Sequence, residues 1–234
     1  MSTIEGSYAL AIMTEDKLIG IRDPHGIRPL ALGRLKNSYV IASETCAFDV
    51  IGAEYIRDVR PGEIIIVTKE GLTSIQTPVP LQSSFCIFEF IYFARTDSVI
   101  DGISVHASRR EAGRILARES PADADIVIGV PDSGTTAALG YAEESGIPYR
   151  EGLIKNRYVG RTFIKPTQAI REQSIRVKLN ALRRIVRGKR IVMVDDSIVR
   201  GTTSKAIVEM LRLAGAREIH MRISSPIIKY PCHL

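Results

Sequence analysis

The stretch Val192-Met-Val-Asp-Asp-Ser-Ile-Val-Arg-Gly-Thr-Thr-Ser204 decides the fold of this 234-residue chain. An apolar run ends in two acids, a short loop follows, and a helix is predicted to begin there. In open α/β sheets, ligands bind at the carboxyl ends of the strands. Asp195 and Asp196 therefore lie where a site is expected. Their side chains should diverge, because successive strand residues point in opposite directions.

The acids and the loop that follows them have complementary chemistry. Two carboxylates can accept hydrogen bonds from two ribose hydroxyls or help to hold a sugar-bound Mg²⁺. The loop adds backbone N–H groups, two hydroxyls and a helix N-terminus, which favour a phosphate, and Gly201 allows close approach. The candidate ligand residues of the loop are Ser197, Val199, Arg200, Gly201, Thr202 and Thr203. A strand–turn–helix whose Asp and Thr serve only as caps is the alternative, but caps do not require this whole string.

A second predicted strand is also followed by a loop of small polar residues and then by a predicted helix. Val130-Pro-Asp-Ser-Gly-Thr-Thr136 follows an apolar strand predicted at Ile126–Val130 and precedes a predicted helix. A loop of Ser, Gly and Thr offers several amides to a pyrophosphate. The candidate ligand residues here are Asp132, Ser133, Gly134 and Thr135. Ser133 is also a candidate Mg²⁺ ligand.

Between these two units lies the basic and aromatic segment Lys155-Asn-Arg-Tyr-Val-Gly-Arg-Thr-Phe-Ile-Lys-Pro-Thr-Gln168. It belongs to a region, residues 150–190, with 13 Lys and Arg against 2 Glu in a chain of net charge +6. Such a region attracts polyanions, and the segment has the residue types of a lid that closes on one. The lid residues expected at the substrate are Lys155, Arg157, Arg161, Lys165 and Gln168. A static surface loop is the alternative.

The first 80 residues differ in pattern from the rest. They predict antiparallel β structure, with strands at Tyr8–Met13, Lys17–Arg22, Leu30–Leu35, Tyr39–Ser43 and Glu63–Thr68. The proline-containing stretch at residues 77–84 is the expected boundary. The expected domains are therefore residues 1–80 and 85–234.

Beyond residue 84, helices alternate with apolar strands. Helices are predicted at Ser108–Glu119, Thr136–Ser145, Arg171–Val186 and Ser204–Ala214, and strands at Ile126–Val130, Ile191–Val194 and Glu218–Ile223. This alternation predicts an α/β fold with a parallel sheet covered on both faces.

Several strings together resemble the amidophosphoribosyltransferases, also called glutamine phosphoribosylpyrophosphate (PRPP) amidotransferases. The matching strings are Gly6-Ser-Tyr-Ala-Leu10, Arg22-Asp-Pro-His-Gly-Ile-Arg-Pro29, Ser43-Glu-Thr-Cys-Ala-Phe-Asp49, Phe88-Glu-Phe-Ile-Tyr-Phe-Ala-Arg95, Lys155-Asn-Arg-Tyr-Val-Gly-Arg-Thr-Phe-Ile164 and Val194-Asp-Asp-Ser-Ile-Val-Arg-Gly-Thr-Thr203. The resemblance covers essentially the whole chain. It implies the parallel sheet and flanking helices of a type I phosphoribosyltransferase. Before these it implies the β-rich second half of an N-terminal-nucleophile glutaminase domain, an α+β sandwich.

The resemblance also implies a glycosyltransferase activity in purine synthesis. The family makes 5-phosphoribosylamine from PRPP and ammonia that a glutaminase domain releases from glutamine. Ser133, Asp195 and Asp196 would hold Mg²⁺, and the segments Asp132–Thr135 and Asp195–Thr203 would grip PRPP. Residues 155–168 would close over it. Purine nucleotides as feedback inhibitors and a homo-oligomeric assembly are further implications.

Two features of the family are not matched in full. The catalytic N-terminal cysteine and the glutamine-binding segments fall upstream of the region matching Met1, so no residue is assigned as the glutaminase nucleophile. Half a glutaminase sandwich should leave open strand edges and an exposed apolar face. Some members bind a [4Fe–4S] cluster through four cysteines. Cys86 and Cys232 fall at two of these positions, and the other two would lie beyond Leu234, so an incomplete cluster site is expected.

Further sequence patterns argue against three other classes of function: membrane proteins, nucleic-acid binders and base-salvage enzymes. No apolar run approaches the roughly 20 residues that cross a bilayer, and the N-terminus lacks the pattern of a signal peptide. We therefore expect a cytoplasmic protein without a membrane partner. A non-catalytic PRPP-sensing regulator that binds nucleic acid stays open, but no helix-turn-helix signature precedes the pocket, so no nucleic acid partner is expected. A base-salvage phosphoribosyltransferase is disfavoured by the strings specific to amidotransferases.

Overall fold

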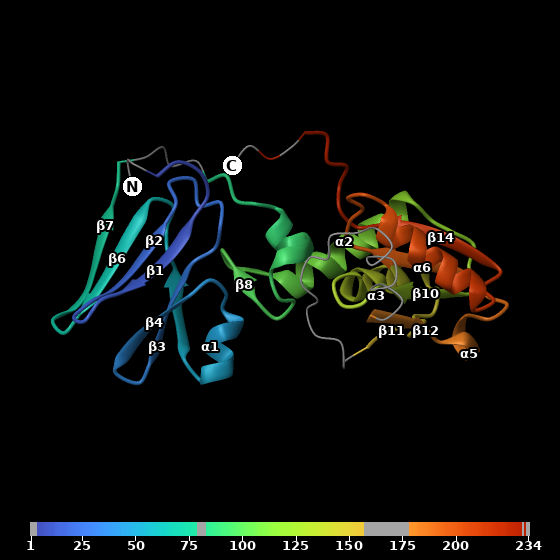
Figure 1. Ribbon diagram of the computed structural model, residues 1–234, viewed down its shortest axis with the longest axis horizontal. Coiled ribbons are helices and arrows are strands. Elements are labelled where there is room, and N and C mark those ends of the chain that lie inside the picture. Colours follow the sequence, from blue (N-terminus) through green and yellow to red (C-terminus); the bar gives the residue numbers. More distant parts are fainter. Residues whose placement is uncertain (1–3, 79–82, 157–177, 231, 233–234) are drawn as a thin grey trace. The chain divides into compact units, whose positions relative to one another are not determined.

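The computed structural model describes residues 4–78, 83–156, 178–230 and 232. The chain folds into two compact units, Met1–Val105 with Ile228–Leu234, and His106–Ile227, and Figure 1 labels most of their elements. The domain limits 1–80 and 85–234 stay a prediction. Within the described residues, no helix has the length and apolar character needed to cross a membrane.

The first unit is built from two antiparallel sheets. One has the order β1 (Ala9–Met13), β2 (Leu18–Arg22), β6 (Glu63–Thr68), β7 (Gly71–Gln76), and the other the order β4 (Ser38–Ala42), β3 (Ala31–Leu35), β5 (Glu54–Asp58). Their common core contains Leu30, Leu32, Val59 and Ile65. The five strands predicted for this part are confirmed. The sequence pattern missed β5, β7, helix α1 (Cys46–Ile51), the π-helical turn Glu89–Phe93 and the short hairpin of β8 (Val99–Ile100) and β9 (Ile103–Ser104).

Apolar side chains are exposed at both edges of the first sheet. Met13 on β1 is 83% exposed and Ile75 on β7 is 48% exposed. β1 and β7 are also the outermost strands of that sheet. The expectation of open strand edges and an exposed apolar face stays a prediction.

The second unit is centred on a parallel sheet of β10 (Ile126–Gly129), β13 (Arg190–Asp195) and β14 (Glu218–Ile223), in the order β10-β13-β14. Alternate residues enter two different cores. Val127, Val192 and Val194 pack with helices α2 (Val105–Glu119) and α3 (Gly134–Ser145). Ile128, Ile191 and Met193 pack with helix α6 (Thr202–Leu213). The predicted α/β fold with both sheet faces covered is confirmed.

One predicted helix is wrong in part. The sequence predicts a helix over Arg171–Val186, but the structure has strand β12 (Leu179–Ala181) and then one helical turn, α5 (Arg183–Val186). β12 pairs antiparallel with β11 (Leu153–Lys155). Its burial alternates, because Leu179 and Ala181 are buried and Asn180 is exposed, so pairing with β11 overrides the helical spacing. Residues 171–177 lie outside the described residues.

Two glycines bring helices α2 and α3 together, and the helices lie side by side in Figure 1. A Cβ atom at Gly113 would lie 1.9 Å from the carbonyl oxygen of Ala137, and one at Gly140 would lie 1.9 Å from that of Arg110. Each helix therefore contacts the backbone of the other directly. This close pair covers one face of the sheet on which the site is built.

Candidate functional site

The ends of β10 and β13 meet at one edge of the sheet. The Val130 N–H donates to the Val194 carbonyl at 2.9 Å. A Cβ at Gly134 would lie only 2.6 Å from that same carbonyl oxygen, so only glycine fits there without a shift. The Ser133 hydroxyl then donates to Asp196 Oδ2. The two loops predicted separately from the sequence thus form one site.

The two acids are buried side by side. Asp195 is 8% exposed and Asp196 is 6% exposed, and the Asp196 N–H donates to Asp195 Oδ1 at 2.9 Å. Burial, and then the negative charge of Asp196, raises the pKa of Asp195 to about 6. Ionising both acids is therefore unfavourable unless positive charge or hydrogen-bond donors arrive. This arrangement suits a cation or a polyol.

Beyond the acids, the chain turns into the uncapped N-terminus of α6. Gly201 adopts a left-handed conformation (φ 72°) as the N-cap of α6, and no side chain caps this helix. The first N–H groups of an uncapped helix remain available to an anion, and the helix dipole favours negative charge there. Arg200 and Thr203 are exposed beside this terminus, and Thr202 is half-buried. Val199 is 83% exposed, so its side chain does not belong to the core.

A hollow of about 600 Å³ opens beside the β10 loop. It is lined by Pro131, Asp132, Glu151, Leu153, Ile154, Lys155 and Asn156. Lys155 pairs with Asp132 across it, so the first residue of the predicted lid reaches the loop that follows β10. The other predicted lid residues, Arg157, Arg161, Lys165 and Gln168, lie outside the described residues.

Sequence reasoning missed a third segment at this edge. The Ser224 N–H donates to the Asp195 carbonyl at 3.0 Å, and the Ser225 N–H donates to the Asp196 carbonyl at 2.9 Å. Both serines follow β14 and are half-buried. Two adjacent polar residues directly after a predicted strand were the available signal, since a parallel β14 must end at the same edge as β13.

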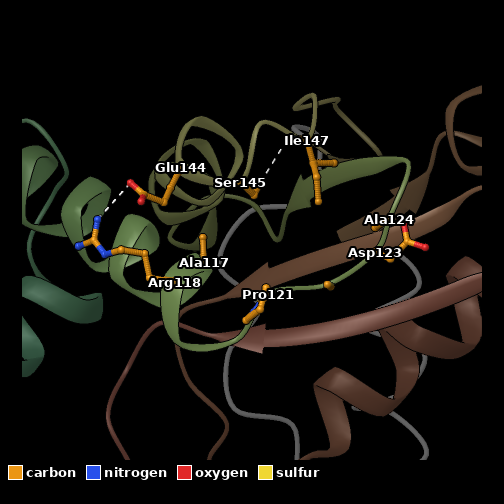
Figure 2. Close-up of a pocket in the computed structure, with 9 residues that line it drawn as sticks. Ala117, Arg118, Pro121, Asp123, Ala124, Glu144, Ser145 and Ile147 are labelled. Atoms are coloured by element: carbon orange, nitrogen blue, oxygen red, sulfur yellow. Dashed lines mark hydrogen bonds and ion pairs between the residues drawn. The ribbon is translucent and has the colours of Figure 1, made fainter.

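A second hollow, of about 380 Å³, lies near the start of β10 at the opposite edge of the sheet. Figure 2 shows its wall, formed by the ends of α2 and α3 and the segment between α2 and β10. Arg118 is paired there with Glu144 at 3.1 Å and also with Glu111. Its cation is thus already neutralised by two carboxylates, which makes this hollow a poor site for phosphate.

The cysteines do not assemble a metal site in the described part of the chain. Cys86 is half-buried and Cys232 is exposed. Among the residues with described positions, no group of three or more His, Cys, Asp or Glu is placed to hold a metal ion. At the strand ends, the Ser133 hydroxyl adds a third oxygen beside the two acids.

Comparison with protein families matches both parts of the chain. Residues 104–224 match the model of the phosphoribosyl transferase domain, and residues 1–50 match that of a glutamine amidotransferase domain. The first match contains both loops at the strand ends and ends at Ser224, so it covers the candidate site except for Ser225.

Individual relatives agree with these matches. The amidophosphoribosyltransferase of Bacillus subtilis is 59% identical over 232 residues, which are 99% of this chain and 49% of the relative. That of Archaeoglobus fulgidus is 57% identical over 231 residues, 99% of this chain and 50% of the relative. A solved structure of glutamine PRPP amidotransferase from B. subtilis, complexed with ADP and GMP, superimposes with a TM-score of 0.91 at 59% identity, over 99% of this chain and 51% of that one. The chain spans about half the length of the relatives it matches.

Proposed function

The chain belongs to the phosphoribosyl transferase family, and from this premise we propose that it carries the transferase site of an amidophosphoribosyltransferase of purine biosynthesis. The reaction would join ammonia derived from glutamine to the anomeric carbon of PRPP and release pyrophosphate. The observation that supports this most strongly is the hydrogen bond from Ser133 to Asp196. It unites a pyrophosphate-type loop and a ribose-phosphate-type loop in one site.

The chain's own residues account for the binding steps. The loop Asp132–Thr135 would receive the pyrophosphate, although the Gly134 and Thr135 N–H groups already donate to the Val130 and Asp132 carbonyls. The N-terminus of α6 with residues 197–203 would receive the 5-phosphate. Asp195 and Asp196 would accept hydrogen bonds from the ribose hydroxyls. Lys155 would exchange its pairing with Asp132 for the pyrophosphate. Displacement at the anomeric carbon passes through an oxocarbenium-like state, so no covalent protein nucleophile is required, and the protein contributes position and charge.

Mg²⁺ fits the residues at the strand ends. Its preferred ligands are oxygens, and Asp195, Asp196 and the Ser133 hydroxyl provide them where two carboxylates lie buried together. These three residues would hold the ion, directly or through water. When bound, Mg²⁺ neutralises charge on the departing pyrophosphate.

We also propose how the protein is regulated and how it assembles. Purine nucleotides would bind at this site as feedback inhibitors, and the protein would act as a homo-oligomer. The limits 1–80 and 85–234 would separate the glutaminase-type part from the transferase part.

A [4Fe–4S] cluster needs four ligands, and the whole sequence has only three cysteines. The residues present do not fit a complete cluster, and no step of the reaction is derived from one.

Titration with PRPP tests the proposal. Wild-type chain should show saturable heat of binding that requires Mg²⁺, and Asp195→Asn/Asp196→Asn should abolish it. Ammonia-dependent release of pyrophosphate would then establish catalysis. Binding without such release would favour the alternative of a non-catalytic PRPP-binding regulator, and a folded chain that does not bind PRPP would contradict both.

A further inference from the structure

Cationic residues gather near the starts of β13 and β14, at the end of the sheet opposite to the acids. They come from two segments: α5 with the turn that leads into β13, and the end of α6 with the turn that leads into β14. Backbone hydrogen bonds join the two turns, because the Gly188 N–H donates to the Gly215 carbonyl at 2.7 Å and the Arg217 N–H donates to the Lys189 carbonyl at 2.9 Å. The cationic residues, which together form the basic edge, are Arg183, Arg184, Arg187, Lys189, Arg212 and Arg217, and all are exposed.

The side chain of Arg187 connects the two segments of the basic edge. A Cβ atom at Gly215 would lie 3.1 Å from the Arg187 Cγ, so the stem of this arginine packs on the opposite turn. Within its own segment, the Arg187 N–H donates to the Arg183 carbonyl at 3.0 Å. Guanidinium and ammonium groups lie at the ends of long, flexible stems. Exposed cations from these adjoining segments can therefore contact one extended ligand.

Neighbouring carboxylates do not neutralise the basic edge. In the described part of the chain, none of its cations forms an ion pair, whereas the arginines of α2 pair with glutamates of α3. The acids nearby already have other partners. Asp125 pairs with Arg190 at 3.1 Å, and Glu218 pairs with His220 at 3.0 Å. The basic edge thus carries an excess of positive charge, which attracts a polyanion.

The composition of the two segments favours one kind of polyanion. Residues 182–189 and 211–218 contain five arginines and one lysine, but no aromatic residue and no Ser, Thr, Asn or Gln. Single-stranded nucleic acids are bound by stacking on aromatic side chains, and proteins that bind RNA duplexes also contact 2′-hydroxyls. Stable protein interfaces need a cluster of apolar anchors, and Leu213 is the large exposed apolar residue of these segments. Arginine and lysine alone suit the dense phosphates of duplex DNA.

We propose that the basic edge binds the phosphate backbone of double-stranded DNA without reading its sequence. Contacts to phosphates require no helix-turn-helix, since that motif serves to reach base edges. The basic edge precedes β13 and the acids end it, so the six-residue strand separates them by on the order of 15 Å. DNA and PRPP would therefore bind at different surfaces, and DNA binding would not depend on the proposed transferase activity.

Reversing two charges of the basic edge tests the proposal. We would follow the fluorescence anisotropy of a short labelled DNA duplex titrated with wild type and with Arg184→Glu/Arg217→Glu. Wild type should bind at about 50 mM salt and lose affinity steeply as the salt concentration rises. The variant should bind at least about tenfold more weakly, and the slope of log K against log salt should fall by about 2, because two phosphate contacts are lost.

The matched control is Lys69→Glu/Lys229→Glu. Both lysines are exposed and belong to the first unit, so this variant has the same change in net charge away from the basic edge. Its affinity for the duplex should stay within about threefold of wild type. Equal losses in the two variants would show that overall charge attracts DNA and that the basic edge is no specific surface.

Other outcomes would also overturn the proposal. A wild type that does not bind the duplex at low salt would show that the basic edge is only a solvated surface. Displacement of the duplex by PRPP with Mg²⁺ would place DNA at the strand-end site instead. An RNA duplex of equal length that binds more than about tenfold tighter would make RNA the partner. If circular dichroism shows that Arg184→Glu/Arg217→Glu is unfolded, Arg184→Gln/Arg217→Gln carries the same comparison, with an expected loss of at least about threefold.

Discussion

Ser133 donates a hydrogen bond to Asp196, although 63 positions separate them in the chain. This bond is the direct side-chain link between the loops that follow β10 and β13. It orients a carboxylate that would otherwise be held by the loop of β13 alone, where Ser197 also donates to it. The orientation of Asp196 toward a ligand therefore depends on a residue of the neighbouring strand end.

Removing this hydroxyl should weaken ligand binding. Hydrogen bonds to charged groups contribute about 1.5–3 kcal/mol, so Ser133→Ala should lower the affinity for PRPP with Mg²⁺ by about tenfold or more. Calorimetric titration measures the change. Ser145→Ala, at an exposed position at the far edge of the sheet, should bind as wild type does. An unchanged affinity in Ser133→Ala would show that Asp196 is oriented without Ser133.

Neutralising Asp195 should stabilise the chain in the absence of ligand. Its carboxylate is buried against Asp196, so Asp195→Asn should raise the free energy of unfolding at pH 8 by on the order of 1–3 kcal/mol. The same change should abolish Mg²⁺-dependent PRPP binding. Urea unfolding in the presence of a chelator measures the first effect. Asp132→Asn, whose side chain is 75% exposed, should change stability by less than about 1 kcal/mol. A destabilised Asp195→Asn would mean that the acid pair is already compensated in the free protein.

Acid should destabilise the first unit through Glu63. This side chain is 2% exposed. Burial alone would raise its pKa, but hydrogen bonds from Arg57, from Ser74 and from the Arg60 N–H outweigh burial and hold the pKa of Glu63 below 4.5. A lowered pKa in the folded state means that this contribution to stability is fully present above pH 4.5. It is lost as the pH falls through the folded-state value.

Glu63→Gln should therefore cost about 2–4 kcal/mol near neutral pH and flatten the loss of stability on acidification. Urea unfolding at several pH values between about 3 and 7 measures both effects. Glu54→Gln, at an exposed position on β5, serves as the control and should keep the wild-type profile. Parallel pH profiles for wild type and Glu63→Gln would contradict this role.

Because α2 and α3 are in close contact, one methyl group added between them should strongly destabilise the chain. A Cβ at Gly140 would lie 1.9 Å from the Arg110 carbonyl oxygen, so Gly140→Ala must push the helices apart. We expect a loss of about 3 kcal/mol or more, seen as a lowered midpoint of thermal unfolding. Ser145→Ala in the same helix should be nearly neutral. A Gly140→Ala chain of wild-type stability would show that the helix pair can separate without disturbing the core.

The sequence predicted the sheet and the two loops because these depend on local patterns. Apolar strands of four to six residues followed by small polar residues are readable without tertiary information, and α3 and α6 carry clear glycine signals at their ends. β11 and β12 were not predicted, because strands of three residues have too little periodicity and Leu179 also fits a helical spacing. Gly134 was expected to expose an amide, yet its close approach to Val194 is a tertiary fact that no local pattern contains. The same holds for the backbone bonds of Ser224 and Ser225.

The two faces of the parallel sheet should differ in how freely they can evolve. On the side of α2 and α3, Gly113 and Gly140 lie directly against the backbone of the neighbouring helix. No side chain there can rotate away to make room for a larger residue. On the side of α6, branched side chains such as Ile207 and Leu211 fill the space against the strands, and one apolar shape can replace another. A library of random substitutions should therefore retain many variants at the α6 face and almost none at Gly113 and Gly140. Efforts to redesign this protein should begin on the α6 face.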